Sequence, residues 1–206
     1  MSADFGFDFR NTSGFVTDPA NCTWAITADT YPQTRIGTTF GYTNGPLGGN
    51  SDNSASVDSR LAGVAIDTNV SGSPSIWRVD LPHSGAWLTD VALGNQVSGE
   101  SNLYLEIRDG ATPLLTLDKA AAISANQYWD ASGVLRTSDT DWVNNHTLVQ
   151  VTFTGTVANV AFGKNQAART TIAHVRFTEV VTSVPPDDGF VLVHSITGPS
   201  TIVGIP

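Results

Sequence analysis

The sequence has few of the residues that cross-link small domains. It holds a single cysteine, Cys22, in 206 residues, so no intramolecular disulfide can form. Its longest apolar runs have only the length of a strand, which excludes a membrane-spanning helix. The N-terminal stretch lacks the cationic segment followed by an apolar one that marks an export signal. These absences predict a protein made in a reducing cytoplasm, with no membrane partner.

Basic residues are also scarce. The chain has 10 Lys plus Arg against 19 Asp plus Glu, which gives a formal net charge of −9, and the basic residues are spread singly. Clustered basic side chains are what binds a phosphate backbone, so we expect no nucleic-acid partner. A domain of this length buries roughly 70% of its unfolded surface. Neither a metal nor a disulfide is therefore needed for stability.

Alternation of apolar and polar residues is the clearest pattern present. In the stretch 76–94, Trp77 and Val79 face one side and Arg78 and Asp80 face the other, and the alternation resumes at Trp87 after a Pro-His-Ser-Gly turn. This period of two predicts an antiparallel hairpin with one buried face. We expect both tryptophans to lie in the core.

The same alternation continues along most of the chain. Further strands are predicted at 5–9, 38–42, 61–66, 103–107, 114–117, 148–154, 157–162 and 172–179, with Asp109-Gly110 as a hairpin turn and with Ala173, Val175 and Phe177 facing inward. Helix-favouring residues occur only at 119–127, which is too short for more than a turn or two. About nine or ten short strands with frequent turns predict an all-β fold, an antiparallel β-sandwich of the jelly-roll type.

The C-terminal residues differ in character from the rest. We assign residues 1–181 to the jelly-roll domain and residues 182–206 to a proline-containing linker and an extended C-terminal arm. Apolar, β-prone segments of this kind bind by adding a strand to a sheet edge, in the same chain or in a neighbouring subunit. The predicted partner-binding residues of the arm are Phe190, Leu192, Ile196, Ile202 and Ile205.

Several segments together resemble a known family. In chain order they are DFGFDFRNTSGFV, TYPQTRIGTTFGY, DSRLAG, WRVDLPHSGAWLTDVALG and TTIAHVRFTEV, and they look like the malectin-like, galactose-binding-like jelly-roll modules. The resemblance covers about Asp4 to Val180. It implies a jelly-roll fold, and either sugar binding, as in modules that accompany polysaccharide-degrading enzymes, or a structural role, as in bacteriophage virion proteins.

No catalytic signature is present. The sequence contains no G-x-S-x-G motif, P-loop, zinc motif or paired carboxylates, and its histidines, His83, His146, His174 and His194, are not clustered. We place His83 in a turn and His174 on the outward face of a strand. We therefore expect no enzymatic activity. A small hydrolase is the alternative, and a histidine within reach of a serine and a carboxylate would reveal it.

Aromatic and polar residues in loops are candidates for sugar binding. Exposed rings stack on pyranose faces, and neighbouring polar groups bind the hydroxyls. By these criteria the candidates are Tyr42, Trp129, Asp130 and Trp142. In the alternative interpretation Trp129 and Trp142 close the ends of the sandwich.

We expect no cofactor. Hard oxygen ligands for a structural calcium ion could come from Asn50, Asp52, Asn53 and Asp58, or from Asp139 with Asp141, but their spacing does not match an EF-hand. A solvated loop is the simpler interpretation. Arg60, next to Asp58, is expected to tie a loop to the sandwich through an ion pair.

The function expected from these observations is a non-enzymatic structural component of a phage virion. It would be a capsid decoration or an accessory head or tail protein, located in the virion after synthesis in the host cytoplasm. Its partners would be other virion proteins or copies of itself, bound through the C-terminal arm. The alternative is a carbohydrate-binding module that mediates adhesion to glycans.

Overall fold

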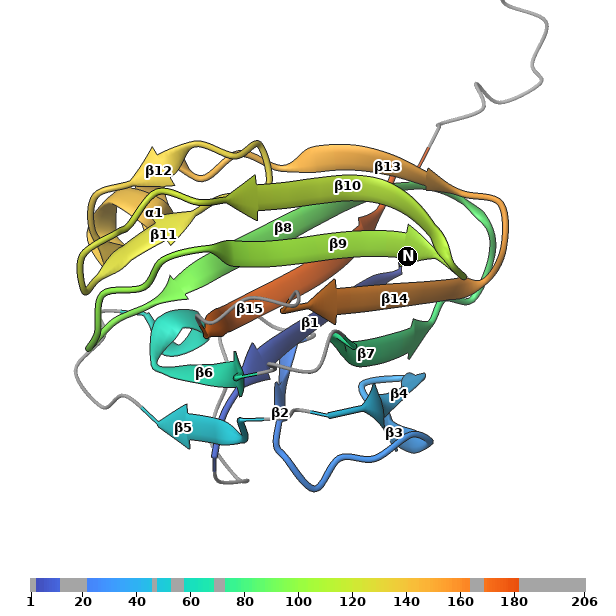
Figure 1. Ribbon diagram of the computed structural model, residues 1–206. Coiled ribbons are helices and arrows are strands. Elements are labelled where there is room, and N and C mark those ends of the chain that lie inside the picture. Colours follow the sequence, from blue (N-terminus) through green and yellow to red (C-terminus); the bar gives the residue numbers. More distant parts are fainter. Residues whose placement is uncertain are drawn as a thin grey trace, which may run out of the picture.

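The structure consists of two β-sheets packed face to face. The computed structural model describes residues 3–11, 22–45, 48–52, 58–68, 73–163 and 169–181. In these residues the chain forms fifteen strands, one short 3-10 helix and one short α-helix. In Figure 1, strands β10, β9 and β14 of one sheet lie in front of β8, β15 and β1 of the other. The predicted β-sandwich is confirmed.

The larger sheet has nine strands. Its main order is β12-β11-β8-β15-β1-β2, β13 pairs with the first half of β8, and β6 joins β5 to β15. All of its pairs are antiparallel except β1 with β2. The strands are β1 (Asp4–Phe9), β2 (Cys22–Ala25), β5 (Asn50–Asp52), β6 (Gly63–Asp67), β8 (Gly85–Asn95), β11 (Gln127–Trp129), β12 (Leu135–Arg136), β13 (Val149–Phe153) and β15 (Thr170–Glu179).

The smaller sheet has six antiparallel strands in the order β10-β9-β14-β7-β4-β3. They are β3 (Gln33–Arg35), β4 (Thr38–Asn44), β7 (Ser75–Asp80), β9 (Leu103–Asp109), β10 (Thr112–Lys119) and β14 (Val157–Phe162). The predicted hairpin at Asp109-Gly110 is confirmed, because β9 and β10 are antiparallel neighbours joined at this turn, with a bulge between Pro113 and Leu115.

An aromatic cluster fills the space between the sheets. Trp77 of β7 is fully buried and packs its ring against Phe7 and Phe9 of the opposite sheet, at centroid distances of 5.5 Å each. From its own sheet it contacts Phe40 at 5.3 Å and Tyr42 at 4.7 Å. Aromatic rings supply large apolar areas and favour such tilted contacts. The cluster therefore joins the two sheets.

The predicted hairpin at 76–94 is wrong. Both of its strands exist, but β7 belongs to the six-stranded sheet and β8 to the nine-stranded sheet, so the chain crosses the sandwich at residues 81–84. Trp77 and Trp87 both lie in the core, as predicted. Alternation places a side chain toward the core but is the same for strands that pair and for strands that face each other.

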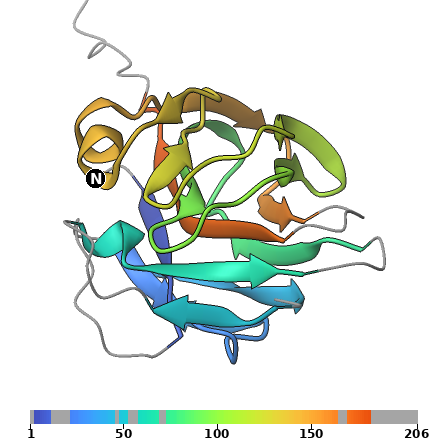
Figure 2. The ribbon, with the colours of Figure 1, turned by 60° about the vertical axis from the view of Figure 1, so that its left-hand side comes forward.

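The outer face of the nine-stranded sheet carries a second apolar cluster. Two short helices, η1 (Ser59–Leu61) and α1 (Asp139–Asn145), cover it, and both lie on the same side of the molecule in Figure 2. The cluster consists of Leu61, Val64, Ala92, Tyr128, Trp142 and Ala173. This face of the sheet is therefore closed to solvent beneath the two helices.

Several local predictions near these helices are wrong. The segment 119–127 contains no helix in the structure, because β10 runs to Lys119 and β11 starts at Gln127. The α-helix instead follows Ser138, whose side chain accepts a hydrogen bond from the Asp141 amide as an N-cap. The predicted strand at 61–66 begins at Gly63, after η1. Ala173 was expected to face inward with Val175 and Phe177. It faces the second cluster instead, because a bulge interrupts the pairing of β15 with β8.

The predicted C-terminal arm lies outside the described residues, whose last member is Val181. The linker and the arm residues Phe190, Leu192, Ile196, Ile202 and Ile205 therefore stay a prediction. Among the described residues, neither helix is long and apolar enough to span a membrane.

The substitution Trp77→Ala tests the central cluster. It should lower the free energy of unfolding by about 3–5 kcal/mol, because it removes a buried ring and leaves a cavity. Chemical denaturation measures this change. The control is Leu148→Ala at a side chain that is 43% exposed, where a change of about 0.5 kcal/mol or less is expected. Equal effects of the two substitutions would contradict the cluster's role.

Candidate functional site

Two of the aromatic residues predicted to bind sugar are buried. Tyr42 lies in the core, with its hydroxyl 3.3 Å from Asn50 Oδ1. Trp142 is fully buried beneath α1 and donates its indole N–H to the carbonyl of Val91 at 3.0 Å. A ring without an exposed face cannot stack on a pyranose. The structure thus argues against these two residues as sugar contacts and gives Trp142 a packing role.

Asp130 is fully buried and has several partners. Its carboxylate accepts hydrogen bonds from Arg136 Nη2 at 2.6 Å, from Ser132 Oγ at 2.7 Å and from the Val134 and Thr147 amides at 3.0 and 3.1 Å. Burial alone would raise the pKa of Asp130, but these hydrogen bonds lower it. Asp130 therefore organises the segment around α1 and offers no open acceptor to a ligand.

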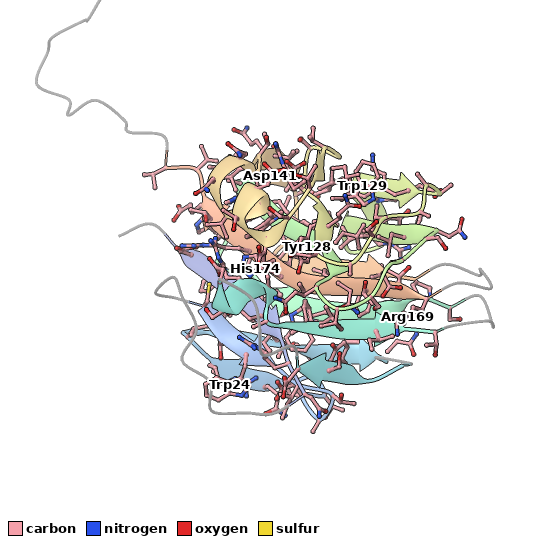
Figure 3. The ribbon with its side chains drawn as sticks, turned by 90° about the vertical axis from the view of Figure 1, so that its left-hand side faces the viewer. Trp24, Tyr128, Trp129, Asp141, Arg169 and His174 are labelled. Atoms are coloured by element: carbon pink, nitrogen blue, oxygen red, sulfur yellow. The ribbon has the colours of Figure 1, made fainter. Side chains whose placement is uncertain are left out.

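Trp129 is the fourth predicted residue and is only half-buried. It packs against the main core, and Lys119 Nζ lies 4.6 Å from its ring centroid. In Figure 3 Trp129 lies at one end of the molecule and Trp24 at the other. Because Tyr42 and Trp142 are buried, Trp129 does not form one exposed platform with them.

The histidines of the described residues contact carboxylates and backbone carbonyls. His83 lies 3.0 Å from Glu179 and 2.8 Å from the carbonyl of Ser84, in an exposed turn as predicted. His146 and His174 contact Asp90, and no serine hydroxyl is bound to any of the three. His194 lies outside the described residues. The arrangement that would reveal a hydrolase is absent from the described part of the chain.

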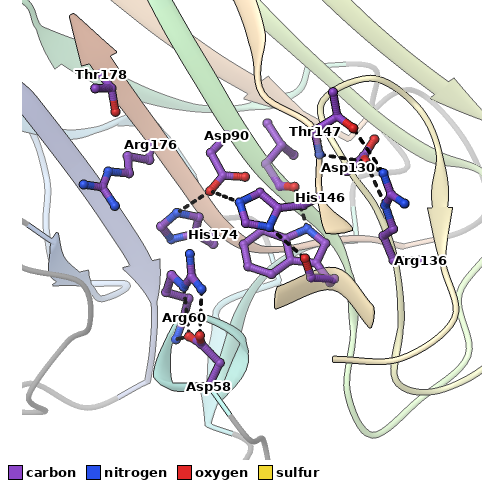
Figure 4. Close-up of polar contacts among 12 residues, drawn as sticks. Asp58, Arg60, Asp90, Asp130, Arg136, His146, Thr147, His174, Arg176 and Thr178 are labelled. Atoms are coloured by element: carbon purple, nitrogen blue, oxygen red, sulfur yellow. Dashed lines mark hydrogen bonds and ion pairs between the residues drawn. The ribbon is translucent and has the colours of Figure 1, made fainter. Parts of the chain in front are cut away.

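His174 belongs to a buried polar network on the outer face of the nine-stranded sheet (Figure 4). It points outward from β15 as predicted, yet it is fully buried because η1 and α1 cover it. Its Nδ1 lies 2.7 Å from Asp8 Oδ1, and its Nε2 lies 3.6 Å from Asp90 Oδ2. His146 Nε2 approaches the same Asp90 oxygen at 3.3 Å.

This network holds α1 onto the sheet. The ring of His146 stacks on Trp142 of α1 at a centroid distance of 4.3 Å. Burial would raise the pKa of Asp90, but the two histidines lower it well below its usual range. Each acid and each histidine of this chain contacts another of its members. We assign it a structural role.

The carboxylates considered as calcium ligands have protein partners. Arg60 Nη2 pairs with Asp58 at 2.7 Å, as predicted for Arg60, and its guanidinium lies 4.9 Å from the Trp142 ring. Asp52 accepts a hydrogen bond from the Asn11 amide, and Asp141 accepts one from the Thr137 amide. Among the described residues no group of three or more His, Cys, Asp or Glu could hold a metal ion. Asn53 lies outside them.

A depression of about 240 Å³ opens beside Gly99, Ser101, Ala122 and Ile123. Its two charged residues bind each other, with Arg169 Nε 2.9 Å from Glu100 Oε2. The ion pair satisfies both charges. We therefore do not assign a ligand to this depression.

The outer face of the six-stranded sheet carries a row of half-buried polar residues. Asn159 of β14 lies directly opposite Arg108 of β9 on one side and Arg78 of β7 on the other. All three side chains point away from the core, because their chain neighbours Ile107, Val160 and Val79 point into it. This is the face turned toward the viewer in Figure 1.

Each arginine of the row is part of a three-residue unit. Arg78 Nε donates to Asp80 Oδ1 at 2.8 Å, and the Tyr31 hydroxyl donates to Asp80 Oδ2 at 2.7 Å. On the other side of Asn159, Arg108 and the Tyr104 hydroxyl both bind Glu106. We call Tyr31, Arg78, Asp80, Tyr104, Glu106, Arg108 and Asn159 the outer polar face.

Gly41 allows Tyr31 to reach this face. The backbone of residues 29–31 crosses directly over Gly41, so a Cβ at this position would lie 2.6 Å from the Tyr31 nitrogen. The same glycine has a φ of +140°, which other residues rarely adopt. Tyr31 consequently lies against β7, with the Arg78 guanidinium 4.3 Å from its ring centroid.

Both tyrosines of the outer polar face stay protonated at neutral pH. The hydrogen bond to Asp80 raises the pKa of Tyr31. Burial and the hydrogen bond to Glu106 raise the pKa of Tyr104 to about 12. Two arginines and two carboxylates therefore leave these seven residues without net charge, with Asn159 at their centre.

The sequence pattern already showed which residues point outward. Arg78 and Asp80 alternate with core residues on one strand, as Tyr104, Glu106 and Arg108 do on another. Their proximity was not apparent, because it depends on β14 lying between β7 and β9 in the sheet. Tyr31 precedes β3, and no alternation pattern in the sequence indicates that it faces outward.

Comparisons with known proteins give distant likenesses in fold. No family model and no curated protein matches the chain. The Bacillus subtilis protein YXIM is similar with a TM-score of 0.48 and 15% identity, over 86% of this chain and 40% of that one. A carbohydrate-binding module of Cellvibrio mixtus lichenase 5A, in complex with cellotriose, gives a TM-score of 0.33 and 15% identity, over 76% and 96%. The chain thus spans less than half of the Bacillus protein, and neither likeness assigns it a function.

Stability should decrease as the pH rises through about 8. Burial would lower the pKa of His174 from 6.5, but Asp8 and Asp90 raise it to about 8. Because the folded-state pKa is above the unfolded one, the stabilisation is complete below pH 6.5 and is lost above pH 8, by about 2 kcal/mol. Urea unfolding across this pH range measures the loss.

The variant His174→Gln cannot titrate at this position and should lose the part of the pH dependence that His174 contributes, whereas His146, whose pKa Asp90 also raises, keeps its own part. The control His83→Gln changes a histidine in the exposed turn and should retain it. If His174→Gln keeps the wild-type pH dependence, His174 is not the group responsible.

Proposed function

We propose that this chain is a non-catalytic binding module for neutral glycans and that the outer polar face is its binding surface. The observation that carries the proposal is the pair of tyrosine–carboxylate–arginine units on either side of Asn159, on a sheet face that no helix of the described residues covers.

The hydrogen-bonding groups of this face suit sugar hydroxyls. Guanidinium, carboxylate and amide groups are planar and can bind two neighbouring hydroxyls at once. In the described residues the Nη groups of Arg78 make no hydrogen bond, and Asn159 uses only its Nδ2, which donates to the Gly110 carbonyl at 2.8 Å. These atoms are available to a ligand.

The charge balance favours a neutral ligand over an anion. Each arginine is paired with its own carboxylate, Arg78 with Asp80 and Arg108 with Glu106. An anionic sugar or a phosphate would be attracted by the guanidinium and repelled by the neighbouring carboxylate to a similar extent. A polyhydroxylated neutral chain makes hydrogen bonds to both without this repulsion.

The tyrosines add apolar surface beside the polar row. Tyr31 and Tyr104 are half-buried, and each hydroxyl is fixed by a carboxylate. Fixed rings lose little conformational freedom on binding and can pack against the C–H face of a pyranose.

The virion hypothesis concerns a different part of the chain. It rests on the C-terminal arm, which lies outside the described residues, and so it stays a prediction. Deleting residues 185–206 tests it, because incorporation into particles should be lost while the sandwich stays folded. A glycan-binding face is compatible with such a particle but does not require one.

The substitutions Arg78→Ala and Arg108→Ala test the proposed surface. Calorimetric titration with cellohexaose, xylohexaose and mannohexaose should show binding by the wild type to at least one of them. Each substitution should weaken that binding about tenfold or more, because a hydrogen bond from a charged group contributes about 1.5–3 kcal/mol.

Arg169→Ala is the matched control, since it removes an arginine from another ion pair, with Glu100. It should leave binding unchanged. Tetragalacturonate, an anionic chain, should bind more weakly than the neutral chains. The proposal fails if none of the three neutral chains binds or if the substitutions at Arg78 and Arg108 have no effect.

A further inference from the structure

We infer that the outer polar face binds its glycan in either chain direction. This inference rests on the proposed function and adds to it the orientation of the ligand. Its basis is an approximate two-fold axis, normal to the sheet, that passes through Asn159 and exchanges the pair Arg78–Asp80 with the pair Arg108–Glu106.

The strand directions generate this symmetry. Strands β7 and β9 are both antiparallel to β14, so they run in the same direction. On β7 the carboxylate of Asp80 comes two residues after Arg78, whereas on β9 the carboxylate of Glu106 comes two residues before Arg108. The two carboxylates therefore lie on opposite sides of the row formed by the arginines and Asn159.

The register confirms the exchange. Asp80 lies opposite Val157, and Glu106 lies opposite Ala161. Val157 and Ala161 stand two residues before and two residues after Asn159 on β14. A half-turn about Asn159 thus places Arg78 on Arg108 and Asp80 on Glu106.

The tyrosines complete the two units from different parts of the chain. Tyr104 is on β9 itself, whereas Tyr31 comes from the segment that crosses over Gly41. Both hydroxyls donate to the carboxylate of their unit, but Tyr31 lies beside Arg78 whereas Tyr104 lies two residues beyond Glu106 on β9. The half-turn therefore relates the arginines and the carboxylates, and not the positions of the tyrosine rings.

The spacing of the two units fits a linear glycan. Arg78 and Arg108 are two strands apart, which is about 9–10 Å in the hydrogen-bonding direction of a sheet. A pyranose unit with its linkage is close to one strand spacing in length, so a chain that lies across β7, β14 and β9 contacts both units.

A glycan chain has a direction, and reversing it exchanges the two units, which offer the same donors and acceptors. The two orientations then have similar free energies.

A spin-labelled glycan tests the inference. The probe is the tightest-binding of cellohexaose, xylohexaose and mannohexaose, with a nitroxide at its reducing end. Amide resonances of the full chain are recorded with the nitroxide active and after its reduction. Thr116 on β10, opposite Glu106, and Thr39 on β4, level with Asp80, each lie two strands from β14 and report on the two ends of the row.

We expect the label to broaden the resonances of both threonines to comparable extents. Arg78→Ala and Arg108→Ala should also weaken binding by comparable factors. Broadening at only one of the two threonines would overturn the inference and leave the proposed function intact. If no chain of the panel binds, the proposed function itself fails, and the inference fails with it.

Discussion

The packing of aromatic rings around Trp77 between the two sheets determines which side chains of the strands face the solvent. Successive side chains of a strand point to opposite faces, so burying Trp77 turns Arg78 to the solvent. The same rule applies to the pairs Ile107 with Arg108 and Val160 with Asn159. The polar row on the outer face is therefore a direct consequence of the apolar residues that bury themselves beneath it.

Side chains also alternate along the strands of the nine-stranded sheet, but there the outward groups are covered. Burying Phe7 in the main core turns Asp8 outward, where it meets His174. On this sheet η1 and α1 cover the outward groups, which pair with one another and hold α1 in place. A polar row that is covered stabilises the fold, whereas one that is uncovered can bind a ligand. This contrast is why we place the binding surface on the six-stranded sheet.

The sequence allowed the fold class, most strands and the β9–β10 hairpin to be predicted, because each depends on local alternation and turn residues. The crossing between β7 and β8 could not be predicted, because alternation does not show which strand pairs with which. The candidate sugar residues lie in or beside predicted loops, but the rings of Tyr42 and Trp142 are buried. The outward orientation of Arg78 and Arg108 was predictable. Their alignment with Asn159 was not, because it depends on the order of distant strands.

The proposed binding surface for a neutral glycan is the face of β7, β14 and β9 that no helix of the described residues covers. Its most direct test is to follow backbone amide chemical shifts while the chain is titrated with the neutral hexasaccharide that binds it best. We expect the largest shift changes to fall on the row formed by Arg78, Asn159 and Arg108. Changes concentrated instead around α1 and Trp129, or no changes with any of the chains, would contradict it.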